Sequence, residues 1–381
     1  MSVIFRNFSW LASFGSIQTP PGRSVSRIPR LLFFISFFLA LPAMALDKSP
    51  DVQSMPTQRI HMSLLQDITM LPGNRLVAVG ERGHIAYSDD NGQSWHQAAV
   101  PTKQMMNAVF FASEKEGWAV GYDGLILHSL DAGETWAIQL DGLAFSKLRA
   151  SYKKMDLNTE ISRLSKKVEN LESAIGRASD DGEDVEELEM DLEDAQVALE
   201  DAEFELDLMQ RMYERNGNTA NPLMDVYFVD GKQGYAVGAF NTFLVTEDGG
   251  KNWSASGEIL DNPEGMHLNA IAGSGDTLVI AGEAGLLLRS TDRGASWEQI
   301  ESPDYGSFFG LYLAEDTSLL QVVGLRGAMF QSEDLGDSWE KIPEGLHKNM
   351  NAIYHGRGDL VLAAGNDGAW FRSLDGGQSF E

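Results

Sequence analysis

An eight-residue pattern, Ser/Thr-x-Asp-x-Gly-x-x-Trp/Phe, recurs six times along this chain. Its final aromatic residue returns after 41, 117, 44, 42 and 41 residues, and five of the eight tryptophans occupy that position. A nearly constant period of this length indicates a repeat architecture rather than unrelated domains. The Asp and aromatic residues of the six octets are Asp90 and Trp95, Asp131 and Trp136, Asp248 and Trp253, Asp292 and Trp297, Asp334 and Trp339, and Asp375 and Phe380.

Two short β-rich runs bounded by glycine precede each octet, as in Asn107–Trp136 and Asn269–Trp297. With the few residues after the aromatic position, each repeat predicts four strands, which is one blade of a β-propeller. The sequence therefore predicts an all-β, six-bladed propeller of Asp-box repeats, with seven blades as the alternative.

The octet falls in the turn between the third and fourth strands of each predicted blade. There the Asp can hydrogen-bond the backbone of the turn, the Gly can adopt a positive φ, and the Trp can fill the space between blades. A catalytic or metal-binding role would require the six aspartates to converge, whereas the symmetry of the blades separates them around the rim. We therefore expect the octets to be structural.

The repeats predict blades 1 and 2 in residues 63–146 and blades 3 to 6 in residues 217–381. The sixth octet ends at Phe380, one residue before the end of the sequence, so the sixth repeat has no complete fourth strand. We expect Thr57–Met62, within a linker of residues 46–62, to supply that strand and close the ring.

Residues 147–216 interrupt the repeats with two apolar patterns typical of helices. A break at Gly176–Asp184 separates them, which predicts an antiparallel coiled-coil hairpin whose arms reach about 45 Å. The first pattern is Leu157, Ile161, Leu164, Val168, Leu171 and Ile175, and the second is Val185, Leu188, Leu192, Ala195, Leu199, Ala202, Leu206, Met209 and Tyr213.

The chain is strongly acidic, with 56 Asp and Glu against 29 Lys and Arg and a net charge of −27. This balance argues against nucleic acid as a partner, because binding to phosphates requires clustered Lys and Arg. Between Asp180 and Asp207 there are fifteen acidic residues and no basic ones. That segment is either a solvated outer face of the second helix or a docking arm for a basic partner.

The N-terminal segment has the features of a signal peptide. Arg23, Arg27 and Arg30 precede the apolar run Leu31–Ala45, which ends in Ala43-Met44-Ala45. We predict that residues 1–45 are a signal peptide, with an uncleaved anchor as the alternative, and that the protein is exported to a periplasm or lumen. The absence of cysteine excludes disulfides and attachment of a lipid through an N-terminal cysteine.

The hairpin insertion opens onto the same side of the propeller as the turns between second and third strands. We predict that this side is the binding face, and that polar residues at the start of the innermost strands surround the channel mouth. The predicted binding-face residues are Glu81, Arg82, Asp123, Asn241, Glu283, Arg326 and Asp367. The residues predicted at the channel mouth are Asp67, Asn107, Asp225, Asn269 and Asn351.

The sequence favours a non-catalytic protein. A glycosidase needs two carboxylates at a defined separation, and a sialidase also needs an arginine cluster, but the predicted turns offer only Arg82 and Arg326. The seven histidines lack metal-ligand spacing, and no nucleophile elbow or phosphate loop is present. We therefore predict no metal and no cofactor. The alternative is a sialidase-like glycoside hydrolase in which carboxylates such as Asp123 and Asp367 face each other across the channel.

Two segments, Gly117–Trp136 and Gly234–Trp253, resemble the repeats of the photosystem II stability/assembly factor family. The resemblance covers residues 63–140 and 222–381. It implies an exported Asp-box (BNR-type) propeller that acts as a scaffold during assembly of a membrane protein complex. Photosynthetic members of the family resemble one another in having seven blades and an arginine-rich contact face. This chain instead has six octets and a strongly acidic composition. In a non-phototroph, the resemblance implies a scaffold for another membrane complex, such as a transporter, with the hairpin as a docking element.

Overall fold

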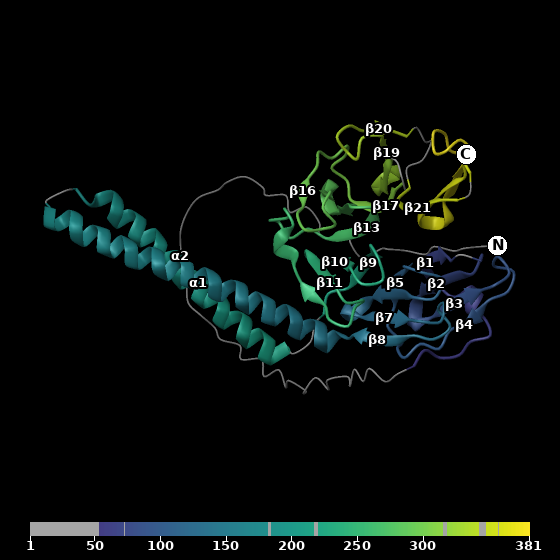
Figure 1. The fold of residues 1–381 in the computed structure, drawn as a ribbon, viewed down its shortest axis with the longest axis horizontal. Coiled ribbons are helices and arrows are strands. Elements are labelled where there is room, and N and C mark those ends of the chain that lie inside the picture. The colour runs from purple at the N-terminus through teal and green to yellow at the C-terminus, as the bar shows by residue number, and fades with distance from the viewer. Residues whose placement is uncertain are drawn as a thin grey trace, which may run out of the picture.

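The fold consists of six antiparallel β-sheets arranged around a common centre, together with one long helical hairpin (Figure 1). The computed structural model describes residues 53–71, 73–181, 184–216, 220–314, 318–342, 348–356 and 358–381. Strands that follow one another in the chain are neighbours in each sheet. The prediction of a propeller of Asp-box repeats with an inserted helical hairpin is confirmed.

Each sheet is one blade, and the blades are numbered in chain order. Blade 1 contains β1 (Leu65–Met70), β2 (Leu76–Gly80), β3 (Ile85–Ser88) and β4 (His96–Gln97). Blade 2 contains β5 (Met106–Phe111), β6 (Gly117–Gly121), β7 (Ile126–Ser129) and β8 (Ala137–Leu140). Blade 3 contains β9 (Leu223–Phe228), β10 (Gly234–Gly238), β11 (Thr242–Thr246) and β12 (Ser254–Ala255).

The remaining three blades follow the hairpin in the same way. Blade 4 contains β13 (Leu268–Ser274), β14 (Thr277–Gly282), β15 (Leu287–Ser290) and β16 (Glu298–Gln299). Blade 5 contains β17 (Phe308–Leu313), β18 (Leu320–Gly324), β19 (Met329–Ser332) and β20 (Glu340–Lys341). Blade 6 contains β21 (Met350–His355), β22 (Val361–Gly365) and β23 (Trp370–Ser373).

The core lies between successive blades, where the apolar faces of two sheets meet. Trp118 of blade 2 is fully buried, and its ring stacks on that of Phe228 of blade 3 with centroids 3.6 Å apart. The Trp of the blade 3 octet, Trp253, packs edge-on against the same Phe228. The second strands of blades 2 to 5 are buried on both faces because each of these blades has a neighbour on either side, as the pattern of β6 shows. Interdigitation between blades therefore supplies most of the buried apolar surface.

Among the residues that the structure describes, the ring of blades is open between blade 6 and blade 1. The innermost strands of every other successive pair pack against each other, but β21 and β1 do not form such a contact in the described part of the chain. The face of blade 6 that corresponds to the interblade surfaces elsewhere is exposed, and Trp370 on it is 63% exposed. On blade 1, Ile68 and Met70 are also exposed. Figure 1 shows the purple blade 1 and the yellow blade 6 apart from each other.

The predicted closing strand at Thr57–Met62 is wrong. Ile60–Met62 forms one turn of 3-10 helix, and the backbone amide of Thr57 donates to the Gln97 side chain of blade 1. This segment is therefore tied to the outer strand of the first blade and does not reach the sixth. Instead, Glu381 exchanges two backbone hydrogen bonds with Arg372 on β23, the pairing that His96 makes with Tyr87 in blade 1. Glu381 thus occupies the position where the fourth strand begins.

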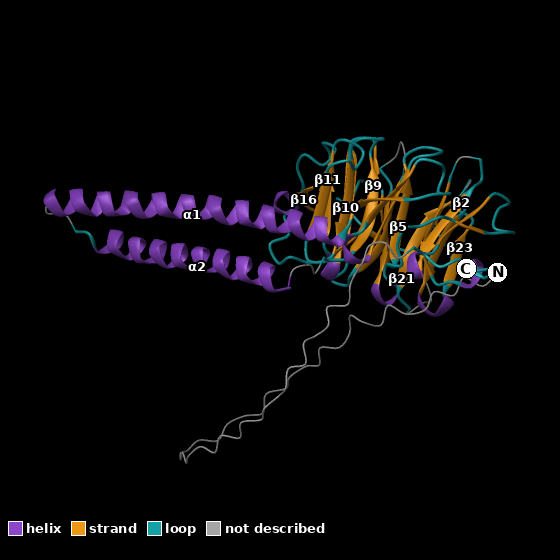
Figure 2. Ribbon diagram, turned by 90° about the horizontal axis from the view of Figure 1, so that it is seen from below, coloured by secondary structure: helices purple, strands orange, loops and turns teal. Residues whose placement is uncertain are grey.

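The hairpin consists of α1 (Gly142–Asp181) and α2 (Glu186–Asn216), and it projects sideways from the propeller (Figure 2). The predicted apolar seam joins the two helices, with Leu157, Leu164 and Ala195 buried in it. At 40 residues, α1 is about 60 Å long. It is longer than predicted at both ends. It begins five residues before residue 147, and it continues to Asp181, past the start of the predicted break at Gly176.

The root of the hairpin is part of the propeller core. Phe145, in the first turn of α1, is fully buried, and a Cβ on Gly124 would lie only 2.6 Å from its ring. Among the described residues, no helix is long and apolar enough to cross a membrane. The predicted signal peptide, residues 1–45, lies outside the described residues.

Candidate functional site

The connections between the second and third strands of all blades lie on one side of the propeller, here called the turn face (Figure 2). Five of the six are short 3-10 turns in which the middle residue has a positive φ, for example 56° at Arg82 and 64° at Asp123. A glycine precedes each turn because the chain passes close to the inner strand: a Cβ on Gly80 would lie 2.0 Å from the carbonyl oxygen of Leu64. The five turns are Glu81–Gly83, Tyr122–Gly124, Glu283–Gly285, Leu325–Gly327 and Asn366–Gly368.

All seven predicted binding-face residues lie in these connections, but three of them hydrogen-bond the local backbone. Glu81 accepts a hydrogen bond from the amide of Leu64, and Glu283 accepts one from the amide of His267. Asn241 donates to the carbonyl of Gly257 at 3.0 Å. Glu81 and Glu283 hold their turns against the chain that leads into the inner strand, and Asn241 holds its turn against the segment after β12, so their first role is structural.

The other four predicted residues belong to separate blades. Asp123 of blade 2 accepts a hydrogen bond from Gln104 at 3.5 Å, and Asp367 of blade 6 lies 3.7 Å from the Lys348 ammonium. Arg82 and Arg326 form no ion pair with a described residue. The two arginine side chains are therefore available to a partner on the turn face, although binding by any of the seven residues remains a prediction.

A hollow of about 400 Å³ opens on the turn face between blades 3 and 4. It is lined by Phe240, Glu264, Met266, His267 and Glu283, among others. Phe240 is exposed and meets the His267 ring edge-on at 4.6 Å, and its backbone amide donates to Nδ1 of the same imidazole. The hollow thus combines an aromatic surface with two carboxylates.

Of the residues that line this hollow, only Glu283 was predicted from the sequence to lie on the binding face. Phe240 lies beside Asn241 in the predicted binding turn, and an exposed aromatic residue there was the available signal. His267 and Glu264 come from the connection between blades 3 and 4, and nothing in the sequence places that connection against the turn of blade 3.

At the channel, polar side chains of the innermost strands join neighbouring blades. Asp67 accepts a hydrogen bond of 2.8 Å from the amide of Val109 in blade 2. In the next step around the ring, Asn107 donates to the carbonyl of Leu223 in blade 3 at 2.7 Å. Aspartate and asparagine continue to alternate around the ring. The carboxylate of Asp225 accepts from the amide of Ile271 in blade 4, and the side chain of Asn269 donates to the carbonyl of Phe308 in blade 5. These residues begin the inner strands as predicted, and each ties its own blade to the next.

Burial alters the acidity of the two channel carboxyls. Burial raises the pKa of Asp225 to about 7, with a smaller contribution from the negative charge of Asp67. Burial likewise raises the pKa of Asp67, against the lowering effect of hydrogen bonds from Val109 and Ile68. In both groups the pKa is raised because desolvation disfavours the charged form, and no reaction is needed to explain the shift.

Asn351 is the exception at the open side of the ring. Its amide donates to Oδ1 of Asn366 in its own blade at 2.7 Å. The equivalent Asn107 and Asn269 both reach a carbonyl of the following blade. Asn351 bonds within its own blade, and among the described residues no following blade packs against β21 as blades 3 and 5 pack against blades 2 and 4.

The six octets adopt one geometry in the turn between third and fourth strands. In blade 4, Asp292 accepts hydrogen bonds from the amide and hydroxyl of Ser296, and Ser290 accepts one from the amide of Gly294. The hydrogen bond from the Ser296 hydroxyl is the largest of the effects that lower the pKa of Asp292 to about 2. The carboxylate thus organises its own turn, on the side of the propeller opposite to the turn face.

In the described part of the chain, no three His, Asp or Glu side chains come together as a group that could hold a metal ion. The channel carboxylates already accept backbone hydrogen bonds, and the octet carboxylates lie apart around the rim.

The hairpin root borders the turn face. A Cβ on Gly142, the first residue of α1, would lie 2.8 Å from the carboxyl carbon of Asp123. Further along α1, burial and a hydrogen bond to Glu258 raise the pKa of the Tyr152 hydroxyl. Glu258 lies in the short helix Gly257–Ile259 that follows blade 3. The hairpin is therefore anchored to blades 2 and 3 beside the predicted binding face.

A family model described as "Photosynthesis system II assembly factor YCF48" matches residues 45–158 and 210–381. Residues 159–209, which form the outer part of the hairpin, lie outside that match. The chain is 40% identical over 81 residues to a Photosystem II assembly lipoprotein Ycf48 of Synechococcus sp. (strain CC9902), a match that covers 21% of this chain and 24% of the relative. It is 30% identical over 81 residues to the chloroplastic Photosystem II stability/assembly factor HCF136 of Arabidopsis thaliana, covering 19% and 20%. The chain thus matches about a quarter or less of the length of these curated relatives.

Two solved structures share the fold. The structure titled "YCF48 bound to D1 peptide" aligns over 88% of this chain and 86% of its own, with a TM-score of 0.50 and 16% sequence identity. YCF48 from Cyanidioschyzon merolae aligns over 87% of both chains, with a TM-score of 0.52 and 14% identity. At these identities the alignments establish the architecture alone.

Proposed function

Because the chain belongs to the Photosynthesis system II assembly factor YCF48 family, we propose that it is an exported, non-catalytic scaffold for the assembly of a membrane protein complex. The observation that carries the proposal is the arrangement of the turn face and the hairpin. The root of α1 packs beside Asp123 of the turn face. The turn face and the start of the hairpin are therefore next to each other. Such an arrangement suits a protein that holds a partner without transforming it.

The partner proposed here is an exposed polypeptide segment of a membrane protein. A YCF48 structure contains a bound D1 peptide, which supports a peptide as the kind of ligand. In this chain, the hollow between blades 3 and 4 offers the Phe240 ring and the carboxylates of Glu264 and Glu283. In a phototroph the complex would be a photosystem, and in a non-phototroph it would be another membrane assembly such as a transporter.

The hollow provides the test. Phe240→Ser removes the exposed ring, and Leu130→Ser is the matched control because Leu130 is similarly exposed in the octet of blade 2, on the opposite side. Affinity capture from detergent-solubilised native membranes should recover the same membrane proteins with wild-type and Leu130→Ser. Phe240→Ser should recover at least about tenfold less, the change that a loss of about 1.4 kcal/mol produces. Equal recovery by all three proteins would remove the hollow from the proposal.

The glycosidase alternative receives no support from the site. Asp123 and Asp367 belong to different blades, and each already has a polar partner. A retaining or inverting mechanism needs two carboxyl groups on either side of one glycosidic bond. A screen with aryl glycosides and natural glycans should give no turnover, and turnover abolished by Asp123→Asn would establish an enzyme instead.

A further inference from the structure

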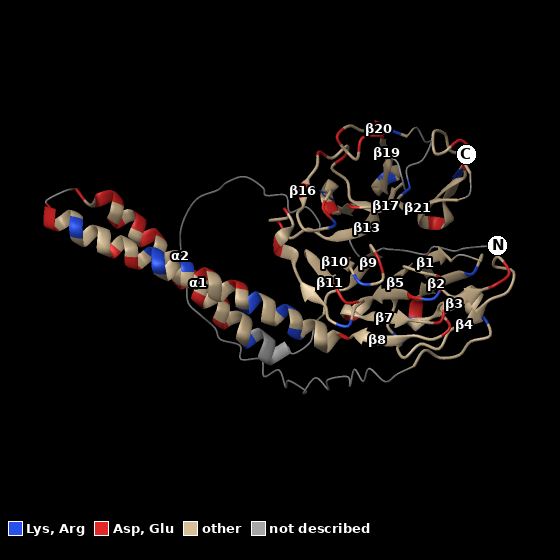
Figure 3. Ribbon diagram, viewed as in Figure 1, with Lys and Arg blue, Asp and Glu red and all other residues tan. Residues whose placement is uncertain are grey.

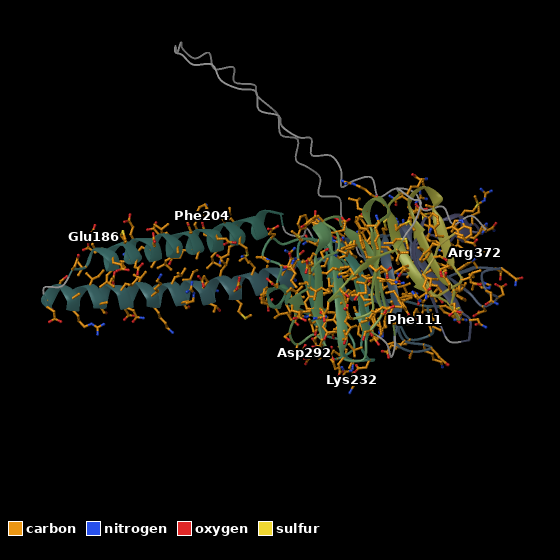
Figure 4. The ribbon with its side chains drawn as sticks, turned by 90° about the horizontal axis from the view of Figure 1, so that it is seen from above. Phe111, Glu186, Phe204, Lys232, Asp292 and Arg372 are labelled. Atoms are coloured by element: carbon orange, nitrogen blue, oxygen red, sulfur yellow. The ribbon has the colours of Figure 1, made fainter. Side chains whose placement is uncertain are left out.

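The outward side of α2 carries an apolar stripe that the hairpin itself does not use. Met190, Val197 and Phe204 are seven residues apart, so they lie on one line along the helix. Their exposed fractions are 60%, 53% and 66%. The seam that packs against α1 lies on the other side of α2, where Ala195 and Ala202 are buried. Figure 4 labels Phe204 on the side of α2 that faces away from α1.

Solvation alone does not explain this stripe. The outward positions of a two-helix coiled coil are normally polar, because apolar residues there gain nothing from the partner helix. The three large apolar side chains stand about 10 Å apart along one line of α2 and together span about 21 Å. A surface of this kind is typical of a helix that packs against a second partner. We call Met190, Val197 and Phe204 the α2 stripe.

Acidic residues flank each member of the α2 stripe in the sequence, and Figure 3 shows red bands along α2. Only two ion pairs neutralise them in the described part of the chain, Glu205 with Lys153 of α1 and Asp207 with Arg211. The remaining carboxylates from Glu186 to Asp207 form no ion pair with a described residue, so this part of the helix carries a net negative charge. The acidic residues from Glu186 to Asp207 are Glu186, Glu187, Glu189, Asp191, Glu193, Asp194, Glu200, Asp201, Glu203, Glu205 and Asp207.

We propose that the α2 stripe binds a basic amphipathic helix of a partner protein, with apolar residues on its contacting side and Lys or Arg on its flanks. The apolar residues of that helix would pack between Met190, Val197 and Phe204, and its cations would neutralise carboxylates such as Glu193 and Glu200. Heptad-spaced apolar contacts with opposite charges at the flanks are the general means by which one helix selects another. A partner helix of about three heptads matches the length of the stripe.

This inference deepens the proposed function and rests on it, since it names a docking partner for the scaffold. The α2 stripe falls within residues 159–209, which the family model does not match. The inference therefore concerns a feature of this chain, separate from the turn face that the family's propeller shares.

The direct test is a titration of the full chain with a synthetic helical peptide of about three heptads, with Leu at the a and d positions and Lys at the e and g positions. Wild-type protein should bind it with an affinity that falls steeply as salt rises. Val197→Ser combined with Phe204→Ser should weaken binding at least about tenfold. Met155→Ser on α1, which is also exposed, should leave binding unchanged. Equal affinity for all three proteins would overturn the inference.

Charge is tested separately by Glu193→Gln combined with Glu200→Gln, which should weaken binding and reduce the salt dependence. These side chains are exposed, so the helical content measured by circular dichroism should not change. Sedimentation velocity is the control for self-association. A dimer that is lost in the Val197→Ser, Phe204→Ser variant would show that a second copy covers the stripe, and this result would also overturn the inference.

The same variants separate this inference from the proposed function. If the double serine variant still captures the native membrane complex while Phe240→Ser does not, the scaffold proposal is supported and the α2 stripe is excluded as its docking site. If the double serine variant loses both the synthetic peptide and the membrane complex, the inference is supported.

Discussion

The carboxylate of Asp225 in blade 3 accepts a hydrogen bond of 2.8 Å from the backbone amide of Ile271 in blade 4. The residue is partly buried beside the channel, and desolvation raises its pKa to about 7. The contact therefore joins two blades through a group whose charged form the fold disfavours. Its contribution to stability must depend on pH.

Asp225→Asn should flatten part of the pH dependence of stability. A folded-state pKa above the unfolded value of 3.8 means that the folded protein binds the extra proton, so this group stabilises the fold less as pH rises from about 4 to about 7. The free energy of unfolding of wild type, relative to Asp225→Asn, should fall across that window. Urea denaturation at a series of pH values measures it, and a constant difference would contradict the raised pKa.

Asn107→Ala should destabilise the propeller more than Asn351→Ala. Asn107 bonds a carbonyl of the next blade, whereas Asn351 bonds a side chain within its own blade. Loss of the interblade bond should cost about 1 kcal/mol and leave the Leu223 carbonyl without its partner. Thermal unfolding of the two variants gives the comparison, and equal losses would show that blade 6 has a covered neighbour side.

Two tryptophan substitutions test the opening between blades 6 and 1. Trp118→Ala removes a ring buried between blades 2 and 3 and should cost about 3–5 kcal/mol. Trp370→Ala removes a ring that is 63% exposed and should cost less than about 1 kcal/mol. Chemical denaturation of both variants is the measurement. A large loss from Trp370→Ala would mean that another blade or segment covers this face in solution.

Asp292→Asn should remove part of the acid sensitivity of the fold. The pKa of Asp292 is lowered to about 2, first by the Ser296 hydroxyl, so the carboxylate stabilises the turn above the ordinary pKa of 3.8. That stability is lost as pH falls from about 4 to about 2. Wild type should lose stability more steeply than Asp292→Asn over this range in thermal melts. Parallel curves for the two proteins would contradict the assigned role of the octet carboxylate.

The repeats and the hairpin could be predicted from sequence because their determinants are local. The hydrogen bonds that shape each turn join residues of one octet, as those among Ser290, Asp292 and Gly294 show. The seam of the hairpin follows from apolar spacing, and Leu157 and Leu164 are buried as that spacing predicts.

The opening of the ring and the hollow could not be predicted, because they depend on distances between segments far apart in the chain. Thr57–Met62 was predicted to be a strand of blade 6, yet a hydrogen bond between Thr57 and Gln97 ties it to blade 1 and Ile60–Met62 forms a 3-10 turn. The hollow requires Phe240 and His267 to meet, and their contact depends on how blades 3 and 4 are joined. The α2 stripe was not predicted because Met190, Val197 and Phe204 are single apolar residues in a strongly acidic segment.

In the proposed function, the hairpin and the turn face together hold a membrane protein complex. A shortened variant tests it, with residues 158–201 replaced by a short Gly-Ser loop. This variant keeps the buried Phe145 and both residues of the ion pair between Lys153 and Glu205.

The most direct measurement is quantitative affinity capture from native membranes with wild-type and shortened protein. Both should show the same β-sheet signal by circular dichroism, and their melting temperatures serve as the control for folding. We expect the wild-type protein to enrich a defined membrane complex and the shortened protein to recover at least about tenfold less of it. Capture of the same complex in equal amount by the shortened protein would contradict the account.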